Sequence, residues 1–331
     1  MDYRSIPGTD LSISSLAIGG WLTLGDGVND AESSRILHAA IDGGVTFLDL
    51  ADVYANGGAE RVVGRFLQEV DRGRLIVSSK VFWPMGEGPN DRGLGRRHIH
   101  ASIDGTLSRL GIGHLDLYFC HREDPSVPLA ETVQAMGDLV QMGKIRAWGT
   151  SYWRPSTLRE AHRVAQSLGV APPRVEQPQF SLLVRGIEND LVPVCQQLGM
   201  AMVAFSPMAG GVLSGKYLDG VPEGSRAAES TWLERFQTPA IAASVREFVA
   251  WCQIEGQDPA AVALAWVMSQ SGITSAICGA RNEAQIRQNL LAADLALDSS
   301  TMAQLDQWFP RGRRALWRRL LGAALRLGRR V

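Results

Sequence analysis

Two ionisable side chains of opposite charge stand at the ends of consecutive apolar segments. Asp49 ends the segment 45–48, and Lys80 ends the segment 75–79. Because an ionised group is costly to bury without a partner, we expect the two to pair. Tyr54 follows five residues after Asp49, where a nearby ammonium would lower the pKa of the phenol and make it a usable general acid. The alternative is a structural ion pair beneath a core tyrosine.

Short apolar segments alternate with longer amphipathic ones, which is typical of βαβ units around a parallel sheet buried on both faces. Strands are expected at 16–18, 45–49, 75–80, 115–120, 145–150, 174–177, 200–205 and 273–278. Helices are expected at 31–42, 59–69, 97–110, 129–142, 156–167, 188–198, 240–255, 258–270 and 283–292, with one long loop at 206–238. Eight such strands, after a β-hairpin at 3–13, predict an α/β fold, the (β/α)8 TIM barrel.

The chain has 331 residues, of which 45% are hydrophobic and 20% charged, so it can bury a large core. No Pro-, Gly- or Ser-rich linker divides it, and we expect residues 1–310 to be a single barrel domain. We see no secretory signal and no apolar run of membrane-spanning length. The four cysteines are scattered and the histidines lack ligand spacing, which indicates reduced thiols, a cytoplasmic protein and no metal site.

Residues 311–331 form a basic C-terminal tail with eight arginines and no acidic residue, and its apolar residues recur at helical spacing. One interpretation is an amphipathic helix that contacts anionic lipid or RNA. We favour the other, a helix packed on an acidic body or a frayed terminus. We therefore expect no nucleic-acid partner, and membrane contact of the tail is the less favoured alternative.

Barrel enzymes carry their reactive groups where strands end, because the loops on that face line the pocket. Polar or aromatic residues follow each expected strand here: Gly20-Trp21, Asp49 to Tyr54, Lys80, His121, Ser151-Tyr152, Gln177, Phe205-Ser206 and Gly279 to Arg281. Other nucleotide and hydrolase motifs are incomplete. No G-x-G-x-x-G is present, Tyr217 stands where a P-loop at 210–216 needs Ser or Thr, and 149–153 lacks the closing glycine of a nucleophile elbow.

The set Asp49, Tyr54, Lys80 and His121, each after a successive strand, resembles the catalytic tetrad of the aldo-keto reductases. The resemblance covers about residues 3–309. Five further motifs resemble the branch that contains the potassium-channel β-subunits: 80–83, 92–94, 121–125, 149–153 and 214–217.

The resemblance implies an NADP-dependent aldo-keto reductase, of the alcohol dehydrogenase type, that reduces aldehyde or ketone carbonyls to alcohols. The chemistry of the residues agrees, since a hydride arriving at a carbonyl carbon leaves charge on the oxygen. Tyr54 would donate the proton, Lys80 would depress its pKa and Asp49 would hold Lys80. His121 would orient the carbonyl through a ring N–H. The alternative for His121 alone is a core histidine.

The resemblance also implies where NADP(H) binds. Ser151 and Gln177 would hold the nicotinamide amide, and Phe205 would stack on the ring, where family members often have tryptophan. Arg281, just before a helix, suits the 2′-phosphate of NADP. The alternative is that Arg281 is a solvent-exposed charge at the start of the helix, with no role in binding. The other expected cofactor residues are Gly20, Trp21, Asp49, Tyr152, Ser206, Pro207, Met208, Ala209, Gly210, Lys216, Arg226, Gly279, Gln285, Gln288 and Asn289. Gln288 departs from the glutamate usual in the family.

The expected substrate pocket is Trp21, Tyr54, Trp83, His121 and Trp153. Trp21, Trp83 and Trp153 would wall it, which implies a small-molecule carbonyl compound that is apolar or aromatic, although each of the three could equally be core packing. Members of this branch form assemblies, so a homo-oligomer is expected. Two functions stay open. One is a carbonyl reductase, which His121 favours because the channel-associated proteins have asparagine there. The other is an NADPH-binding, redox-sensing regulatory subunit with slow turnover.

Overall fold

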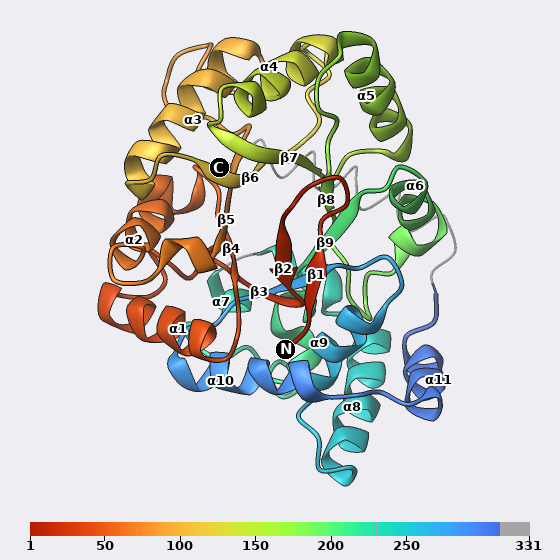
Figure 1. The fold of residues 1–331 in the computed structure, drawn as a ribbon. Coiled ribbons are helices and arrows are strands. Elements are labelled where there is room, and N and C mark those ends of the chain that lie inside the picture. Colours follow the sequence, from red (N-terminus) through yellow and green to blue (C-terminus); the bar gives the residue numbers. More distant parts are fainter. Residues whose placement is uncertain (230, 312–331) are drawn as a thin grey trace.

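A computed structural model describes residues 1–229 and 231–311. Eight parallel strands close into a barrel in the order β10-β3-β4-β5-β6-β7-β8-β9, and helices surround it (Figure 1). The barrel strands are β3 (Leu16–Gly19), β4 (Phe47–Asp49), β5 (Ile76–Val81), β6 (Leu115–Cys120), β7 (Ile145–Ser151), β8 (Val175–Gln177), β9 (Ala201–Phe205) and β10 (Ser275–Cys278). The predicted TIM barrel is confirmed.

The N-terminal hairpin closes one end of the barrel. Its strands β1 (Tyr3–Ser5) and β2 (Ser12–Ser14) pair antiparallel, and β2 ends just before β3 begins. Ile6, Leu11 and Ile13 belong to one buried apolar cluster with inward-facing barrel residues such as Phe47 and Phe119. The amino ends of the strands are therefore plugged by apolar side chains, and the carboxyl ends remain for a site.

The helices pack their apolar faces on the outside of the barrel, where a second and larger cluster of buried residues lies. They are α1 (Asp30–Asp42), α2 (Gly58–Phe66), α3 (Arg96–Leu110), α4 (Leu129–Gln141), α5 (Pro155–Leu168), α6 (Leu191–Gln197), α7 (Arg226–Glu229), α8 (Pro239–Ile254), α9 (Pro259–Ser269), α10 (Glu283–Leu290) and α11 (Ser299–Trp308). Several begin with a polar cap, as when the Asn282 side chain accepts the backbone N–H of Gln285 in α10.

Two segments differ from the sequence prediction. The expected loop at 206–238 contains α7 and two 3₁₀ turns, Ala209–Ser214 and Thr231–Phe236. Helix α11 was not predicted, although Asp298 caps its first turn. The basic tail lies outside the described residues except for Arg311, whose guanidinium pairs with Glu188.

Candidate active site

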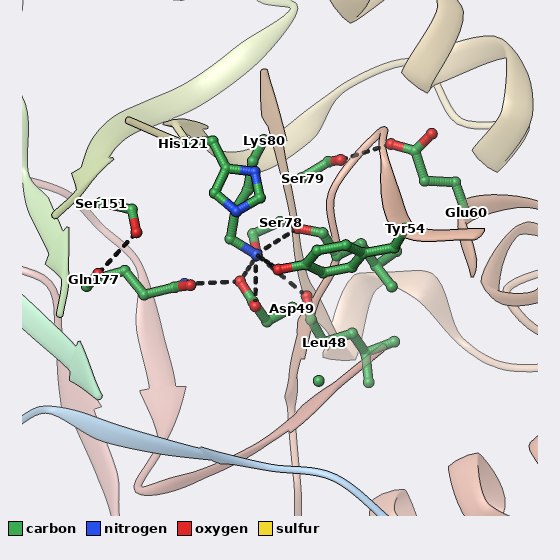
Figure 2. Close-up of polar contacts among 12 residues, drawn as sticks. Leu48, Asp49, Tyr54, Glu60, Ser78, Ser79, Lys80, His121, Ser151 and Gln177 are labelled. Atoms are coloured by element: carbon green, nitrogen blue, oxygen red, sulfur yellow. Dashed lines mark hydrogen bonds and ion pairs between the residues drawn. The ribbon is translucent and has the colours of Figure 1, made fainter. Parts of the chain in front are cut away.

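A buried ion pair lies at the open end of the barrel, with a phenol beside it (Figure 2). Asp49 ends β4, and Lys80 is the inward-facing residue near the end of β5. The Lys80 ammonium is fully buried, and it donates to Asp49 Oδ2 at 2.7 Å, to the Leu50 carbonyl at 2.7 Å and to the Tyr54 hydroxyl oxygen at 3.1 Å. All three of its protons are therefore used.

The pKa of Tyr54 contradicts the prediction in direction. Burial raises it above the ordinary tyrosine value, the nearby Asp49 carboxylate raises it too, and the Lys80 ammonium lowers it against both. The prediction counted the ammonium and left out the loss of water around a fully enclosed phenol. Tyr54 is thus a protonated phenol whose oxygen accepts from Lys80, and no acceptor for its own proton is present among the described residues.

His121 follows β6 and faces Tyr54, with the two ring centroids 5.9 Å apart. Burial, together with the charges of Arg122 and Lys80, holds its pKa well below the usual histidine value, so the imidazole is neutral. Within the described residues its Nδ1 is buried without a hydrogen-bond partner, and His121 lines the cavity described below. A neutral imidazole can present one N–H donor to a carbonyl oxygen.

Residues of neighbouring strands also hydrogen-bond to the second carboxylate oxygen of Asp49, Oδ1. Ser78 donates to Asp49 Oδ1 at 2.9 Å, and the Gln177 side-chain amide donates to the same oxygen at 2.9 Å. The Ser151 hydroxyl in turn donates to the Gln177 carbonyl at 2.9 Å. Ser151 and Gln177, expected to hold a nicotinamide amide, therefore lie side by side, and Gln177 connects them to the ion pair by its hydrogen bond to Asp49 (Figure 2).

An open cavity of about 1580 Å³ lies over this group. It is lined by most of the residues expected at a cofactor: Trp21, Asp49, Ser151, Tyr152, Gln177, Phe205, Ser206, Pro207, Met208, Gly210, Lys216, Arg226, Gly279, Arg281, Gln285, Gln288 and Asn289. Tyr54, Trp83 and His121 line it as well. The same cavity therefore contains two sets of groups. Tyr54 and His121 could donate a proton or a hydrogen bond to a substrate, and Lys216, Arg226 and Arg281 could bind phosphate.

The loops around the cavity hold an unusual concentration of backbone strain. Six non-glycine residues of the described chain have φ between 49° and 59°: Leu22, Ala55, Asn56, Tyr152, Ser206 and Ala209. All but Ala209 line the cavity. Such conformations cost free energy and are concentrated at functional sites in proteins.

The far part of the cavity fits a dinucleotide in its donor chemistry. Gly210 and Gly211 have φ of 71° and 96°, which exposes backbone beside Lys216. Arg281 directly precedes the cap of α10, and its guanidinium donates to the Gly224 carbonyl across the cavity. Gln285 accepts the Arg281 backbone N–H at 2.8 Å, so the two expected contacts at this helix start lie together.

Comparison with known proteins now decides the family. A sequence profile described as the aldo/keto reductase family matches residues 15–309. The chain belongs to the aldo/keto reductase family. Two similar proteins, from Oryza sativa subsp. japonica and Arabidopsis thaliana, are called probable voltage-gated potassium channel subunit beta. They are 37% and 36% identical over 308 residues, which is 89% of this chain and 92% of each relative.

A third relative, from Schizosaccharomyces pombe, is called a putative voltage-gated potassium channel subunit beta. It is 36% identical over 302 residues, 88% of this chain and 88% of its own. These matches confirm the predicted family and branch. Among its described residues this aldo/keto reductase has no helix both long and apolar enough to cross a membrane, and no group of three or more potential metal ligands.

Three expected site residues of this aldo/keto reductase do not line the cavity: Gly20, Ala209 and Trp153. Gly20 and Ala209 are buried just beneath it, where the Gly20 N–H donates to the Asp49 carbonyl at 3.0 Å. Trp153, expected in the substrate pocket, is instead part of the core with 2% of its surface exposed. The left-handed turn at Tyr152 explains this, because it presents Tyr152 to the cavity and its successor to the helices.

Sequence reasoning also missed cavity residues, above all Arg122, Gln179, Trp232 and Arg235. The motif 121–125 carried the resemblance to the family branch, but it gave Arg122 no role in the site. A usable signal existed for Arg122, since the residue after a strand-end histidine starts a loop on the open face. No comparable signal marks Trp232 or Arg235, which reach the cavity from the long segment after β9.

Proposed function

We propose that this protein is an NADPH-dependent oxidoreductase that reduces aldehyde or ketone carbonyls to alcohols. The observation that carries the proposal is the Tyr54 hydroxyl, which accepts from a fully buried Lys80 while its own proton has no acceptor among the described residues. A phenol held in this way at a cavity wall is suited to give its proton to a substrate oxygen.

The bound cofactor would supply a hydride to the carbonyl carbon. Ser151 and Gln177 would hold its amide end, and Phe205 offers a ring face beside them. Lys216 and Arg226 would meet the pyrophosphate and ribose, and Arg281 the 2′-phosphate that distinguishes NADP from NAD. Gln285, Gln288 and Asn289 complete the adenosine end of the same cavity.

The chain's own part in the reaction is placement and proton transfer. His121 would direct a ring N–H at the carbonyl oxygen and fix its position. Tyr54 would donate its proton to that oxygen as negative charge develops there. The Lys80 ammonium would stabilise the phenolate that remains, and Asp49 would keep Lys80 protonated and in place.

A second candidate function is an NADPH-binding regulatory subunit that turns over slowly and acts on a partner. It is favoured by the names of the three relatives, all of which are called potassium channel β-subunits. His121 favours the reductase, because a neutral imidazole lining the cavity can donate a ring N–H to a carbonyl oxygen.

The deciding experiment follows NADPH oxidation at 340 nm with a panel of aldehydes, for the wild type and for Tyr54→Phe. We expect turnover by the wild type and a loss of roughly 10²- to 10⁴-fold in kcat for the variant, the range for a general acid. Phenylalanine keeps the ring that packs at the site, so NADPH binding measured by fluorescence titration is the control. Equal rates would refute the assigned acid. Tight NADPH binding without turnover would favour the regulatory subunit.

A further inference from the structure

Arg122 places a guanidinium in the wall of the cavity, one residue after His121. Its central carbon lies 4.7 Å from the Tyr152 ring centroid and 5.8 Å from that of Trp83, so it packs against two aromatic rings. One nitrogen, Nη1, donates to the His121 carbonyl. The remaining donors have no partner among the described residues, although a guanidinium has five N–H groups.

No carboxylate forms an ion pair with Arg122 within the described chain. The carboxyl that acts on the pKa of Arg122 is that of Glu176 on β8, which accepts from the Thr150 hydroxyl and from the Trp153 backbone N–H. Burial raises the pKa of Glu176 to about 8, so this carboxyl is mostly neutral at pH 7 and does not cancel the guanidinium charge.

The other groups around Arg122 are neutral or already paired. Burial raises the pKa of Tyr54 and that of Tyr152, which keeps both phenols protonated, and His121 is uncharged. Lys80 and Asp49 cancel one another. Among the described residues, none of these groups therefore cancels the positive charge of Arg122.

A second guanidinium, that of Arg235, is linked to the Tyr152 hydroxyl through Gln179. Arg235 donates through Nη2 to Gln179 Oε1 at 3.0 Å, and the same oxygen accepts the Tyr152 hydroxyl at 3.0 Å. Arg235 stacks on Trp232 and Phe236, with 4.3 and 4.7 Å to the ring centroids, and it too has no carboxylate partner among the described residues.

Stacking alone does not account for this arrangement. Burial lowers the pKa of both arginines, which is the sign of a charge held at a cost in free energy. A structural role would be served more cheaply by a carboxylate partner or by a neutral side chain of similar size. A negatively charged ligand entering the cavity would remove the cost and use the idle donors.

We infer that Arg122, supported by Arg235, selects carbonyl substrates that carry a carboxylate group. A planar guanidinium that packs on two rings and donates to the His121 carbonyl is fixed in orientation, and its fork matches the two oxygens of a carboxylate. The inference rests on the proposed carbonyl reduction, because it assigns the substrate class of that same cavity. Arg122 acts here as a specificity-determining residue that contacts the end of the substrate opposite the reacting carbonyl.

The kinetic test compares 2-, 3- and 4-carboxybenzaldehyde with the methyl ester of each, using NADPH oxidation by the wild type, Arg122→Met, Arg122→Lys and Arg159→Met. We expect wild-type kcat/KM for at least one acid to exceed that for its ester about 10-fold or more, mainly through KM. Arg122→Met should reduce this ratio at least about 10-fold, and Arg122→Lys should keep part of it. Arg159, which is exposed on α5 and forms its one hydrogen bond within the described residues with Gln197, controls for the change in net charge.

A binding test needs no turnover. Isothermal titration calorimetry of the full chain with benzoate and with benzamide, with and without saturating NADP⁺, should give benzoate a Kd about 10-fold lower or better. The preference should vanish in Arg122→Met and persist in Arg159→Met. Circular dichroism establishes that each variant is folded.

The outcomes separate the two proposals. Turnover of the aldehydes with equal ratios in wild type and Arg122→Met would overturn the carboxylate site and leave the reductase standing. Arg122-dependent binding of benzoate without turnover of any aldehyde would overturn the reductase and leave an anion site. A wild type that prefers the esters, or that binds benzoate no better than benzamide, would overturn the inference on its own.

Discussion

Asp49 ends β4 and Asp52 comes three residues later, yet the two carboxyls lie in opposite environments. Asp49 faces the cavity side, where it accepts from Lys80, Ser78 and Gln177. Asp52 turns toward the helices, where Ser102 of α3 donates to it at 2.8 Å and the Val53 N–H at 2.7 Å. Both residues are buried, with 3% of Asp49 and 0% of Asp52 exposed, but only Asp49 has a cation in contact.

The second environment belongs to a network between the barrel and its helices. Tyr118 of β6 donates to Ser102, and Ser79 donates to Glu60 of α2, which also pairs with Arg109 of α3. Ser79 lies between Ser78 and Lys80 on β5, and alternation of side chains along a strand sends it outward while its neighbours face inward. The inner group is the one proposed to transfer a proton, and the outer one joins helices to the barrel.

The largest effect should come from removing the inner cation. In Lys80→Met, Asp49 is left buried without its partner, and unfolding should become easier by about 3–5 kcal/mol. The phenolate of Tyr54 also loses its stabilising charge, so kcat for aldehydes should fall at least about 100-fold. Urea unfolding and NADPH oxidation measure the two losses.

A double variant separates the loss of stability from the loss of activity. Asp49→Leu with Lys80→Met removes both charges, and it should recover much of the stability but none of the activity, since an apolar pair can replace a buried ion pair. Recovery of activity in the double variant would contradict the role given to Lys80.

Asp52, the carboxyl of the outer network, should have a smaller effect on the free energy of unfolding, and this effect should depend on pH. Burial raises the pKa of Asp52 to about 7, with the Glu60 charge acting in the same direction and Ser102, Val53 and Arg109 against it. The folded protein thus keeps a proton that the unfolded chain releases near the ordinary aspartate value. Stability should fall as the pH rises through this window, up to about pH 7, by on the order of a few kcal/mol.

Asp52→Asn removes this titration, so its unfolding free energy should vary less between pH 5 and 8 than that of the wild type. Asp219→Asn, at an exposed carboxylate, is the matched control and should keep the wild-type slope. Parallel slopes for Asp52→Asn and the wild type in urea unfolding at several pH values would show that Asp52 does not carry this proton.

The comparison also explains what the sequence could predict. Eight apolar segments and their spacing specify the barrel, and parallel strands bring Asp49, Lys80, His121 and Gln177 to one face, so their meeting followed from topology. The direction of the Tyr54 pKa shift did not follow, because it depends on how completely loops exclude water from the phenol. The outer network was missed because residues such as Asp52 and Glu60 gain partners only when α2 and α3 pack on the strands.

Cavity membership was predictable for most residues at strand ends, including Tyr152 and Ser206, although Gly20 does not line the cavity. Trp153 was misplaced because the left-handed backbone at Tyr152, which no sequence pattern marks, turns its successor into the core. Helix α11 was missed because its pattern is weakly amphipathic and only one residue, Leu305, is fully buried.

The smallest effect is expected where the sequence prediction was wrong, at Trp153. Its indole is in the core, and its Nε1 has no hydrogen-bond partner among the described residues. Trp153→Phe leaves a small cavity but also removes a buried unpaired donor, so the loss of stability should be only about 1–2 kcal/mol. Because Trp153 does not line the site, KM for aldehydes should change less than in Trp83→Phe, where the replaced ring forms part of the cavity wall. Thermal unfolding and KM measured side by side on the two variants test this. A larger change in KM for Trp153→Phe than for Trp83→Phe would return Trp153 to the substrate pocket.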